Sequence, residues 1–190
     1  MTRATRDSLM VVGYTLAGML ATAVAGWVTL GPIVFNRWDF LLRYLVVGFS
    51  GALIYLGVRT RAWGHALVMA GVLFIGYVVL GGQFSAKVAL NAAIWTVPVA
   101  GMLILSSWLF GVLGRTPFGK FLLMGLLLGV GYGIGAFAWL ALNPMPLTAA
   151  NVLGQAIGGL RLGGLLGFVL EAMDFVRSRI NGDVSPFRER

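Results

Sequence analysis

Six long apolar stretches divide the chain, and polar residues gather in the short segments between them. Each stretch comes close to or exceeds the roughly 20 helical residues that cross the hydrocarbon core of a bilayer. None alternates apolar and polar residues as the roughly ten-residue strands of a membrane barrel do. The pattern therefore predicts six transmembrane helices, at residues 9–34, 40–58, 63–82, 88–113, 121–142 and 149–173.

Turn-forming residues separate these stretches, including Gly31-Pro32, Gly81-Gly82 and Asn143-Pro144. The segments outside the stretches are short, so we expect one six-helix transmembrane domain over residues 9–173. A cytoplasmic N-terminus over residues 1–8 and a cytoplasmic tail over residues 174–190 would flank it. The charged end of the sixth helix, including Asp174 and Arg177, is expected to be solvated.

Basic residues alternate between the two sides of the predicted bundle. Three lie on one side, namely Arg37, Arg43 and Lys87. Ten lie on the other side: Arg3, Arg6, Arg59, Arg61, Arg115, Lys120, Arg177, Arg179, Arg188 and Arg190. Because cytoplasmic segments carry the excess of Lys and Arg, both termini are predicted to be cytoplasmic, as an even number of spans requires. The predicted fold is an all-α integral membrane protein, and a prokaryotic plasma (inner) membrane is its default location.

The N-terminal stretch has an alternative interpretation. Two early arginines, an apolar run and the residues Ala21-Thr22-Ala23-Val24-Ala25 resemble a secretory signal with a cleavage site. The apolar run continues to Phe35, however, which is much longer than the apolar part of a signal. A retained first helix is therefore favoured.

Composition agrees with a membrane protein and excludes several kinds of chemistry. Hydrophobic residues make up 59% of the 190 positions and charged residues only 11%, whereas soluble domains average about 25% charged. The chain has no Cys and one His, so disulfides, thiolate metal sites and multi-histidine cages are excluded, and no metal or cofactor is expected. The net charge of +8 lies between the apolar stretches, which favours contact with the membrane surface over nucleic acid.

Glycine is abundant, with 28 residues, and in two helices it recurs every fourth position. Helices in lipid associate mainly through close backbone approach, which glycine permits. The sequence therefore predicts tight packing of the fifth and sixth helices, on each other or on a partner, through Gly125, Gly129, Gly133, Gly159, Gly163 and Gly167.

A weak internal repeat relates two helical hairpins. Residues 26–57 and 76–107 share eight identities over 32 ungapped positions, including matching Gly-aromatic-Val starts at Gly26 and Gly76. Because the offset spans two helices, the repeat would be a tandem hairpin duplication and not the inverted repeat of many transporters.

Arg161 is the most unusual residue, because it lies near the middle of the sixth apolar stretch. A guanidinium there costs several kcal/mol unless it is paired, hydrated or able to reach the interface. Its expected partner is a carbonyl or polar side chain, water, an anionic ligand or lipid, or another subunit. We select Arg161, Asn151, Gln155 and Asn91 as candidate substrate-binding residues.

These candidates do not form one obvious site in the sequence. Asn151 and Gln155 share a helix face, whereas Arg161 points roughly 80–120° away from it. Arg43 lies about one turn inside the second stretch, so its side chain is expected to extend to the outer interface.

No catalytic constellation is found, and the chain is not expected to be an enzyme. The residues Gly48-Phe49-Ser50-Gly51 resemble the serine motif of rhomboid proteases. The only available base is His65, whose predicted position is roughly 12 Å away from Ser50 in depth. A general base must lie within hydrogen-bonding reach of its nucleophile.

Two classes of function remain. The first is a small transport or channel component for an anionic or polar small solute near Arg161. The chain's size, topology and Ala17-x-x-x-Ala21-x-x-x-Ala25 stripe resemble the substrate-binding subunits of energy-coupling-factor vitamin importers, and its hairpin repeat is similar to small acid-resistance membrane proteins. Neither resemblance supplies residue roles. The alternative is a non-catalytic accessory subunit of a larger membrane complex, or a homo-oligomer.

Overall fold

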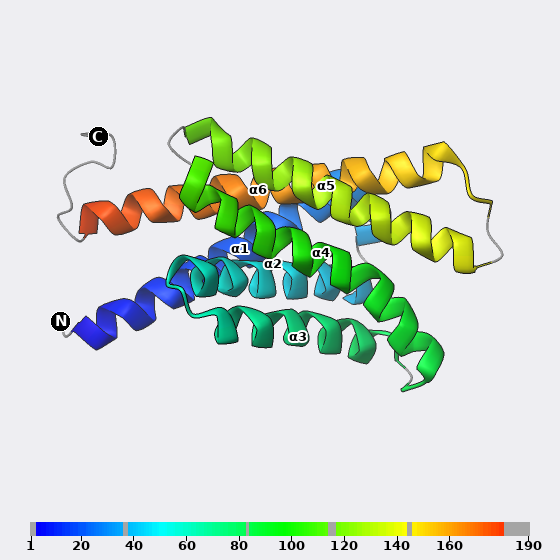
Figure 1. Ribbon diagram of the computed structural model, residues 1–190, viewed down its shortest axis with the longest axis horizontal. Coiled ribbons are helices and arrows are strands. Elements are labelled where there is room, and N and C mark those ends of the chain that lie inside the picture. The colour runs from blue at the N-terminus through cyan, green and yellow to red at the C-terminus, as the bar shows by residue number, and fades with distance from the viewer. Residues whose placement is uncertain (1–2, 36–37, 83, 114–116, 144–145, 181–190) are drawn as a thin grey trace.

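A computed structural model describes residues 3–35, 38–82, 84–113, 117–143 and 146–180. These residues form six helices and no strand: α1 (Arg3–Phe35), α2 (Trp38–Arg59), α3 (Trp63–Leu80), α4 (Ala86–Leu113), α5 (Pro117–Leu142) and α6 (Ala149–Ile180) (Figure 1). All six are long and apolar enough to cross a membrane. The predicted all-helical architecture is confirmed to this extent. Residues 181–190 of the expected tail lie outside the described residues.

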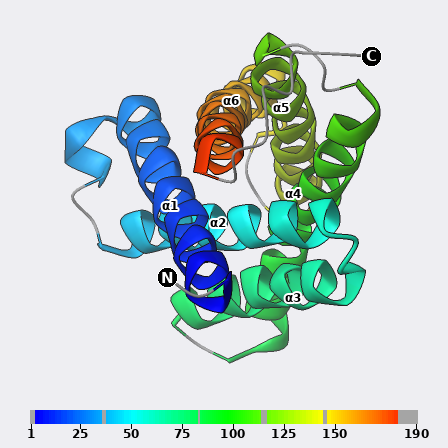
Figure 2. The ribbon, with the colours of Figure 1, turned by 90° about the vertical axis from the view of Figure 1, so that its left-hand side faces the viewer.

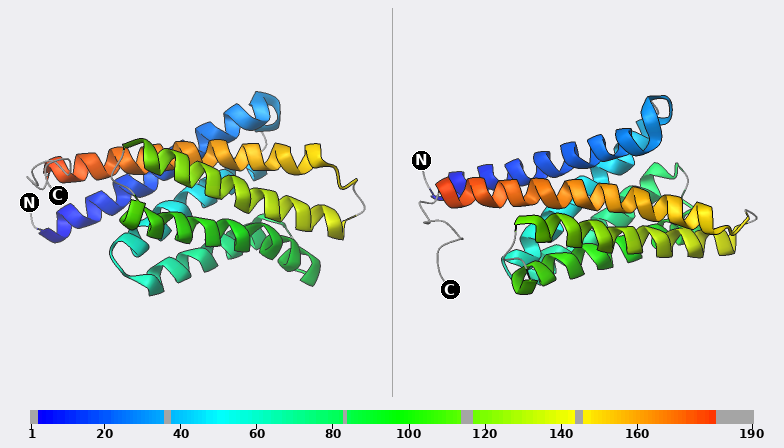
Figure 3. Two further views of the ribbon diagram at one scale, coloured as in Figure 1. Left: turned by 45° about the horizontal axis from the view of Figure 1, so that its top comes forward. Right: turned by 90° about the horizontal axis from the view of Figure 1, so that it is seen from above.

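The helices run alternately up and down, with α2 in a central position. Helix α2 contacts α1, α3, α4 and α6. Figure 2 shows α3 on one side of α2 and the pair α5 and α6 on the other. The first residues of α1 and the last described residues of α6 lie at the same end of the bundle in both views of Figure 3.

The outer surface of the bundle is apolar. Large hydrophobic side chains are widely exposed on it, including Leu20, Val97 and Phe168, which are 67%, 66% and 58% exposed. An apolar surface this extensive is unstable in water and natural in lipid. The structure therefore suggests a multi-pass membrane protein.

Local signals begin and end the helices. Ser85 Oγ accepts a hydrogen bond from the backbone N–H of Val88 at the start of α4, and Thr148 Oγ1 accepts one from Asn151 at the start of α6. Such caps satisfy N–H groups that have no partner within the helix. Near the end of α1, Gly31 interrupts the helix with φ of 73°, a conformation that a side chain disfavours.

Helices α5 and α6 form the most extensive helix–helix contact in the bundle. A Cβ added at Gly159 would lie 2.6 Å from the Leu128 carbonyl oxygen, and one added at Gly167 would lie 2.8 Å from the Lys120 carbonyl oxygen. At Gly163 it would overlap the backbone of α5. At the remaining three selected glycines the nearest atoms of the facing helix would lie 3.0–3.5 Å away: Gly125, Gly129 and Gly133. The two backbones therefore approach at the spacing that glycine allows.

A second close approach, between α1 and α2, was not anticipated. A Cβ added at Gly18 would lie 2.7 Å from the carbonyl oxygen of Gly48. Next to it, the Thr22 hydroxyl donates to the Tyr44 carbonyl oxygen at 2.7 Å. The Gly48 motif, considered above for catalysis, thus brings two helices together.

Adding one methyl group to α6 separates tight from open glycine positions. We expect Gly163→Ala to destabilise the fold by about 1–3 kcal/mol, the usual cost of overpacking, because its Cβ would lie 2.8 Å from the Leu128 Cβ and closer still to backbone. Gly154→Ala is the matched control, since nothing lies within 4 Å of its Cβ. Unfolding of both variants in mixed micelles with increasing SDS measures the difference. Equal stability of the two variants would contradict the tight contact.

Candidate functional site

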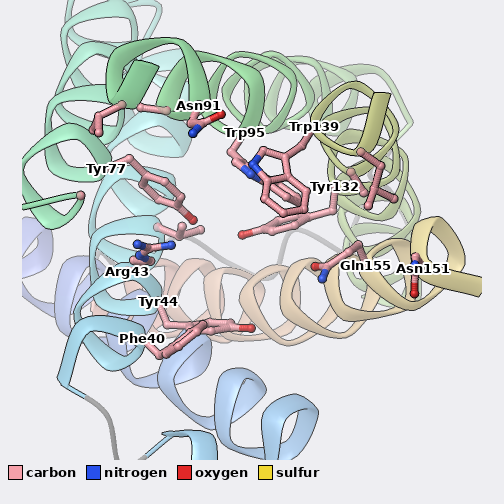
Figure 4. A pocket seen from close by; sticks show the side chains of 16 residues that line it. Phe40, Arg43, Tyr44, Tyr77, Asn91, Trp95, Tyr132, Trp139, Asn151 and Gln155 are labelled. Carbon is pink, nitrogen blue, oxygen red and sulfur yellow. The ribbon is translucent and has the colours of Figure 1, made fainter. Parts of the chain in front are cut away.

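A pocket of about 600 Å³ lies between five helices (Figure 4). Its lining residues belong to the end of the bundle where α1 leads into α2, α3 into α4 and α5 into α6. Its lining on α4 runs from Val88 to Trp95, so the pocket extends roughly 10 Å along that helix. The lining is completed by Phe40, Arg43, Tyr44, Val47, Tyr77, Gly81, Val88, Asn91, Ala92, Tyr132, Ala136, Trp139, Leu140, Asn151 and Gln155.

Arg43 supplies the positive charge in this lining. Its guanidinium carbon lies 5.8 Å from the ring centre of Phe40 and 5.9 Å from that of Tyr77, both within the range of cation–π attraction. Its Nε is buried and has no hydrogen-bond partner among the described residues. A buried donor without a partner costs free energy, which a bound acceptor would recover. Contrary to the expectation that Arg43 extends to the outer interface, its side chain lies in the pocket (Figure 4).

Aromatic rings form much of the pocket wall. The rings of Trp95 and Tyr132 lie 6.2 Å apart between centres with an interplanar angle of 51°. Figure 4 shows Trp139 beside them and the hydroxyls of Tyr77 and Tyr132 pointing toward one another. The wall therefore offers flat apolar surface with hydroxyl groups at its edges.

Three of the four candidate substrate-binding residues line the pocket: Asn91, Asn151 and Gln155. Gln155 points into it from α6 (Figure 4). The Asn151 side chain donates to the Pro146 carbonyl oxygen at 3.2 Å, which anchors it to the segment before α6. The structure thus brings together amides from α4 and α6 that sequence separation alone did not connect.

Arg161, the fourth candidate, does not line the pocket and is exposed on the outer face of α6. Its neighbours on that face include Ile157 and Leu160, each 42% exposed. Among the described residues no hydrogen bond or ion pair of Arg161 is found. This orientation agrees with the helical phase noted above, which turned Arg161 away from Gln155.

A second polar cluster lies at the opposite end of the bundle. The Asp174 carboxylate on α6 accepts hydrogen bonds from the hydroxyls of Tyr14 and Tyr55 and forms an ion pair with Lys120 Nζ at 2.9 Å. Both tyrosines are fully buried and stack on each other with ring centres 6.3 Å apart, and Phe110 from α4 packs edge-on against Tyr55. One carboxylate therefore joins α1, α2, α5 and α6.

This carboxylate cluster (Tyr14, Tyr55, Lys120 and Asp174) corrects the expectation of a solvated helix end. The side chains of Asp174 and Lys120 are only 23% and 10% exposed. Sequence distance hid the cluster, because its members come from four separate helices. The sequence did contain one signal for the cluster. Asp174 lies in the last turns of an apolar helix, and Tyr14 and Tyr55 lie toward the ends of two other helices on the same side of the bundle.

The groups considered for catalysis or metal binding lie apart. Ser50 is fully buried, and its Oγ has no hydrogen-bond partner in the described part of the chain, whereas His65 is exposed at the start of α3. Within the described ranges no three His, Asp or Glu side chains gather at metal-binding distance. The pocket itself offers a cation, amides, hydroxyls and aromatic faces.

No family model, curated protein or solved structure matches this chain.

Removing one member of the carboxylate cluster tests its contribution to stability. We expect Lys120→Met to destabilise the fold by about 3–5 kcal/mol, because it leaves the largely buried Asp174 carboxylate without its counter-charge. The double variant Lys120→Met/Asp174→Leu removes both charges and should lose less stability than Lys120→Met alone. SDS unfolding of the two variants, with Lys87→Met as an exposed-lysine control, measures the effect. A Lys120→Met variant as stable as the control would contradict a stabilising role of the carboxylate cluster.

Proposed function

We propose that this chain is a small membrane transport component that binds an anionic or polar small solute in the pocket around Arg43. The observation that carries the proposal is a buried guanidinium nitrogen with no hydrogen-bond partner among the described residues, which lies at a polar and aromatic pocket within helices long enough to span a membrane. A pocket of 600 Å³ falls within the range of about 300–1,000 Å³ that holds small ligands. Asn91, Asn151 and Gln155 remain the proposed polar contacts.

The location and orientation of the protein belong to the same proposal. Of the described basic residues, Arg59, Arg61, Arg177 and Arg179 lie at the end of the bundle opposite the pocket. Because this excess favours the cytoplasm, both termini would be cytoplasmic and the pocket would lie on the outer side of a prokaryotic plasma membrane. The site would then receive solute from outside the cell.

A second candidate function is that of an accessory subunit in a larger membrane complex. The exposed Arg161 within the apolar span of α6 favours it, because an intramembrane charge on a lipid-facing surface is costly without a partner. In that case a neighbouring chain or a lipid headgroup would contact Arg161, and the pocket would serve the assembly.

Substitutions at the two arginines distinguish these candidates. We expect protein purified in mild detergent from its native membranes to retain a small-molecule mass in native mass spectrometry. Arg43→Gln should lose that mass, because the pocket loses its cation, while Arg161→Gln should keep it.

The opposite result, with loss only in Arg161→Gln, would move the solute site to α6. Another polypeptide at fixed stoichiometry in the wild type that is lost in Arg161→Gln would favour the accessory subunit. No retained mass in any sample would count against solute binding.

Single cysteines test the proposed orientation directly, because the natural chain contains none. Phe84, 85% exposed, precedes α4 near the pocket, and Thr60 follows α2 at the opposite end. We expect a membrane-impermeant maleimide to label Phe84→Cys in intact cells and Thr60→Cys only after the membrane is opened. Labelling of Thr60→Cys alone in intact cells would reverse the orientation.

A further inference from the structure

We propose that the solute is an organic monoanion: a flat, ring-containing molecule with one carboxylate, whose carboxylate binds Arg43 and whose ring lies against the aromatic wall. This inference rests on the proposed function and narrows it to a ligand class. Four features of the pocket lead to it: its charge, the way the cation is held, the shape of its wall and the position of its amides.

The charge of the lining selects an anion. Of the sixteen described residues that line the pocket, Arg43 is the only one with a charged side chain, and none of the sixteen is acidic. In the low dielectric of a membrane-embedded pocket an uncompensated charge is costly, so a ligand of the opposite charge is favoured. A single guanidinium balances one negative charge, which favours a carboxylate over a doubly charged phosphate.

The way Arg43 is held favours a planar acceptor. The guanidinium carbon lies over the rings of Phe40 and Tyr77, 5.8 and 5.9 Å from their centres, and the buried Nε has no hydrogen-bond partner among the described residues. A carboxylate can accept two parallel hydrogen bonds from one edge of a guanidinium, and the buried Nε is one of the donors involved in such a pairing. Cation–π attraction to these two rings favours this position of the side chain, and a side chain that is already positioned lowers the entropic cost of binding.

The wall beyond Arg43 fits a flat ring. Trp95, Tyr132 and Trp139 come from two helices and meet on one side of the pocket (Figure 4). Aromatic side chains bind flat rings through offset or edge contacts, which contribute about 0.5–1.5 kcal/mol beyond simple burial. Amides at Asn91 and Gln155 lie on either side of this wall (Figure 4), where they can bond polar atoms on the ring.

A matched set of probes separates charge from shape. Indole-3-acetate, indole-3-acetamide and tryptamine share the indole ring system. The first carries a negative charge, the second is neutral and the third carries a positive charge. Octanoate keeps the carboxylate without a ring, and phenyl phosphate keeps a ring with a phosphate. Val88 lines the pocket and is partly exposed, so a Val88→Cys variant reports occupancy through slower reaction with a small maleimide.

We expect indole-3-acetate to protect Val88→Cys at concentrations at least tenfold below those of the other four probes. Adding Arg43→Gln should remove that advantage, so that the acid and the neutral amide protect at similar concentrations. Arg161→Gln, on the outer face of α6, is the control and should leave the order of the probes unchanged. To test for an anionic lipid in the pocket, protection of Val88→Cys is also measured in phosphatidylcholine vesicles with and without phosphatidylglycerol.

Equal protection by the acid and the amide, or acid protection that survives Arg43→Gln, would overturn the anion while leaving a solute pocket in place. Stronger protection by octanoate, or by phosphatidylglycerol alone, would overturn the flat ring in favour of an acyl chain. No protection by any probe would overturn both the ligand class and, with no retained mass from native membranes, the proposed function.

Asp39 stands four residues before Arg43 in the sequence. Anion protection that appears only with Asp39→Asn would show Arg43 already neutralised, and would overturn the proposal.

Discussion

A carboxylate largely removed from water needs donors, and Asp174 finds three of them on three other helices. An ion pair of this kind costs desolvation energy, so it stabilises the bundle only while Tyr14, Tyr55 and Lys120 keep their positions. The cluster therefore holds α1, α2, α5 and α6 together at one end. At the other end, away from this constraint, five helices leave room for the pocket around Arg43.

Two kinds of contact thus divide the length of the bundle. Glycines bring α5 against α6 and α1 against α2 along the spans, where lipid gives helices little other reason to associate. Charged and aromatic groups then occupy the two ends. The asymmetry matters for function, because the charge of Asp174 is satisfied within the protein, whereas the Nε of Arg43 is buried without a protein acceptor among the described residues.

Hydropathy predicted the six long apolar helices, because a long apolar run in lipid satisfies its backbone hydrogen bonds by forming a helix. Helical phase also separated Arg161 from Gln155 correctly. What the sequence could not supply was which helices meet. Tyr14 and Asp174 are 160 residues apart in the sequence. Asn91 and Gln155 line the same pocket only because α4 and α6 both face it. Arg43 was misjudged for the same reason: its place near a span end suggested the interface, while Tyr77 from another helix holds it in the pocket.

The most direct measurement is an experimental density map of the protein purified from its native membranes without added ligand. The account predicts density for a small molecule against the Arg43 guanidinium, between Tyr77 and the wall of Trp95 and Tyr132. A pocket closed by its own side chains, with Arg43 turned toward the membrane surface and no bound molecule beside it, would contradict the account.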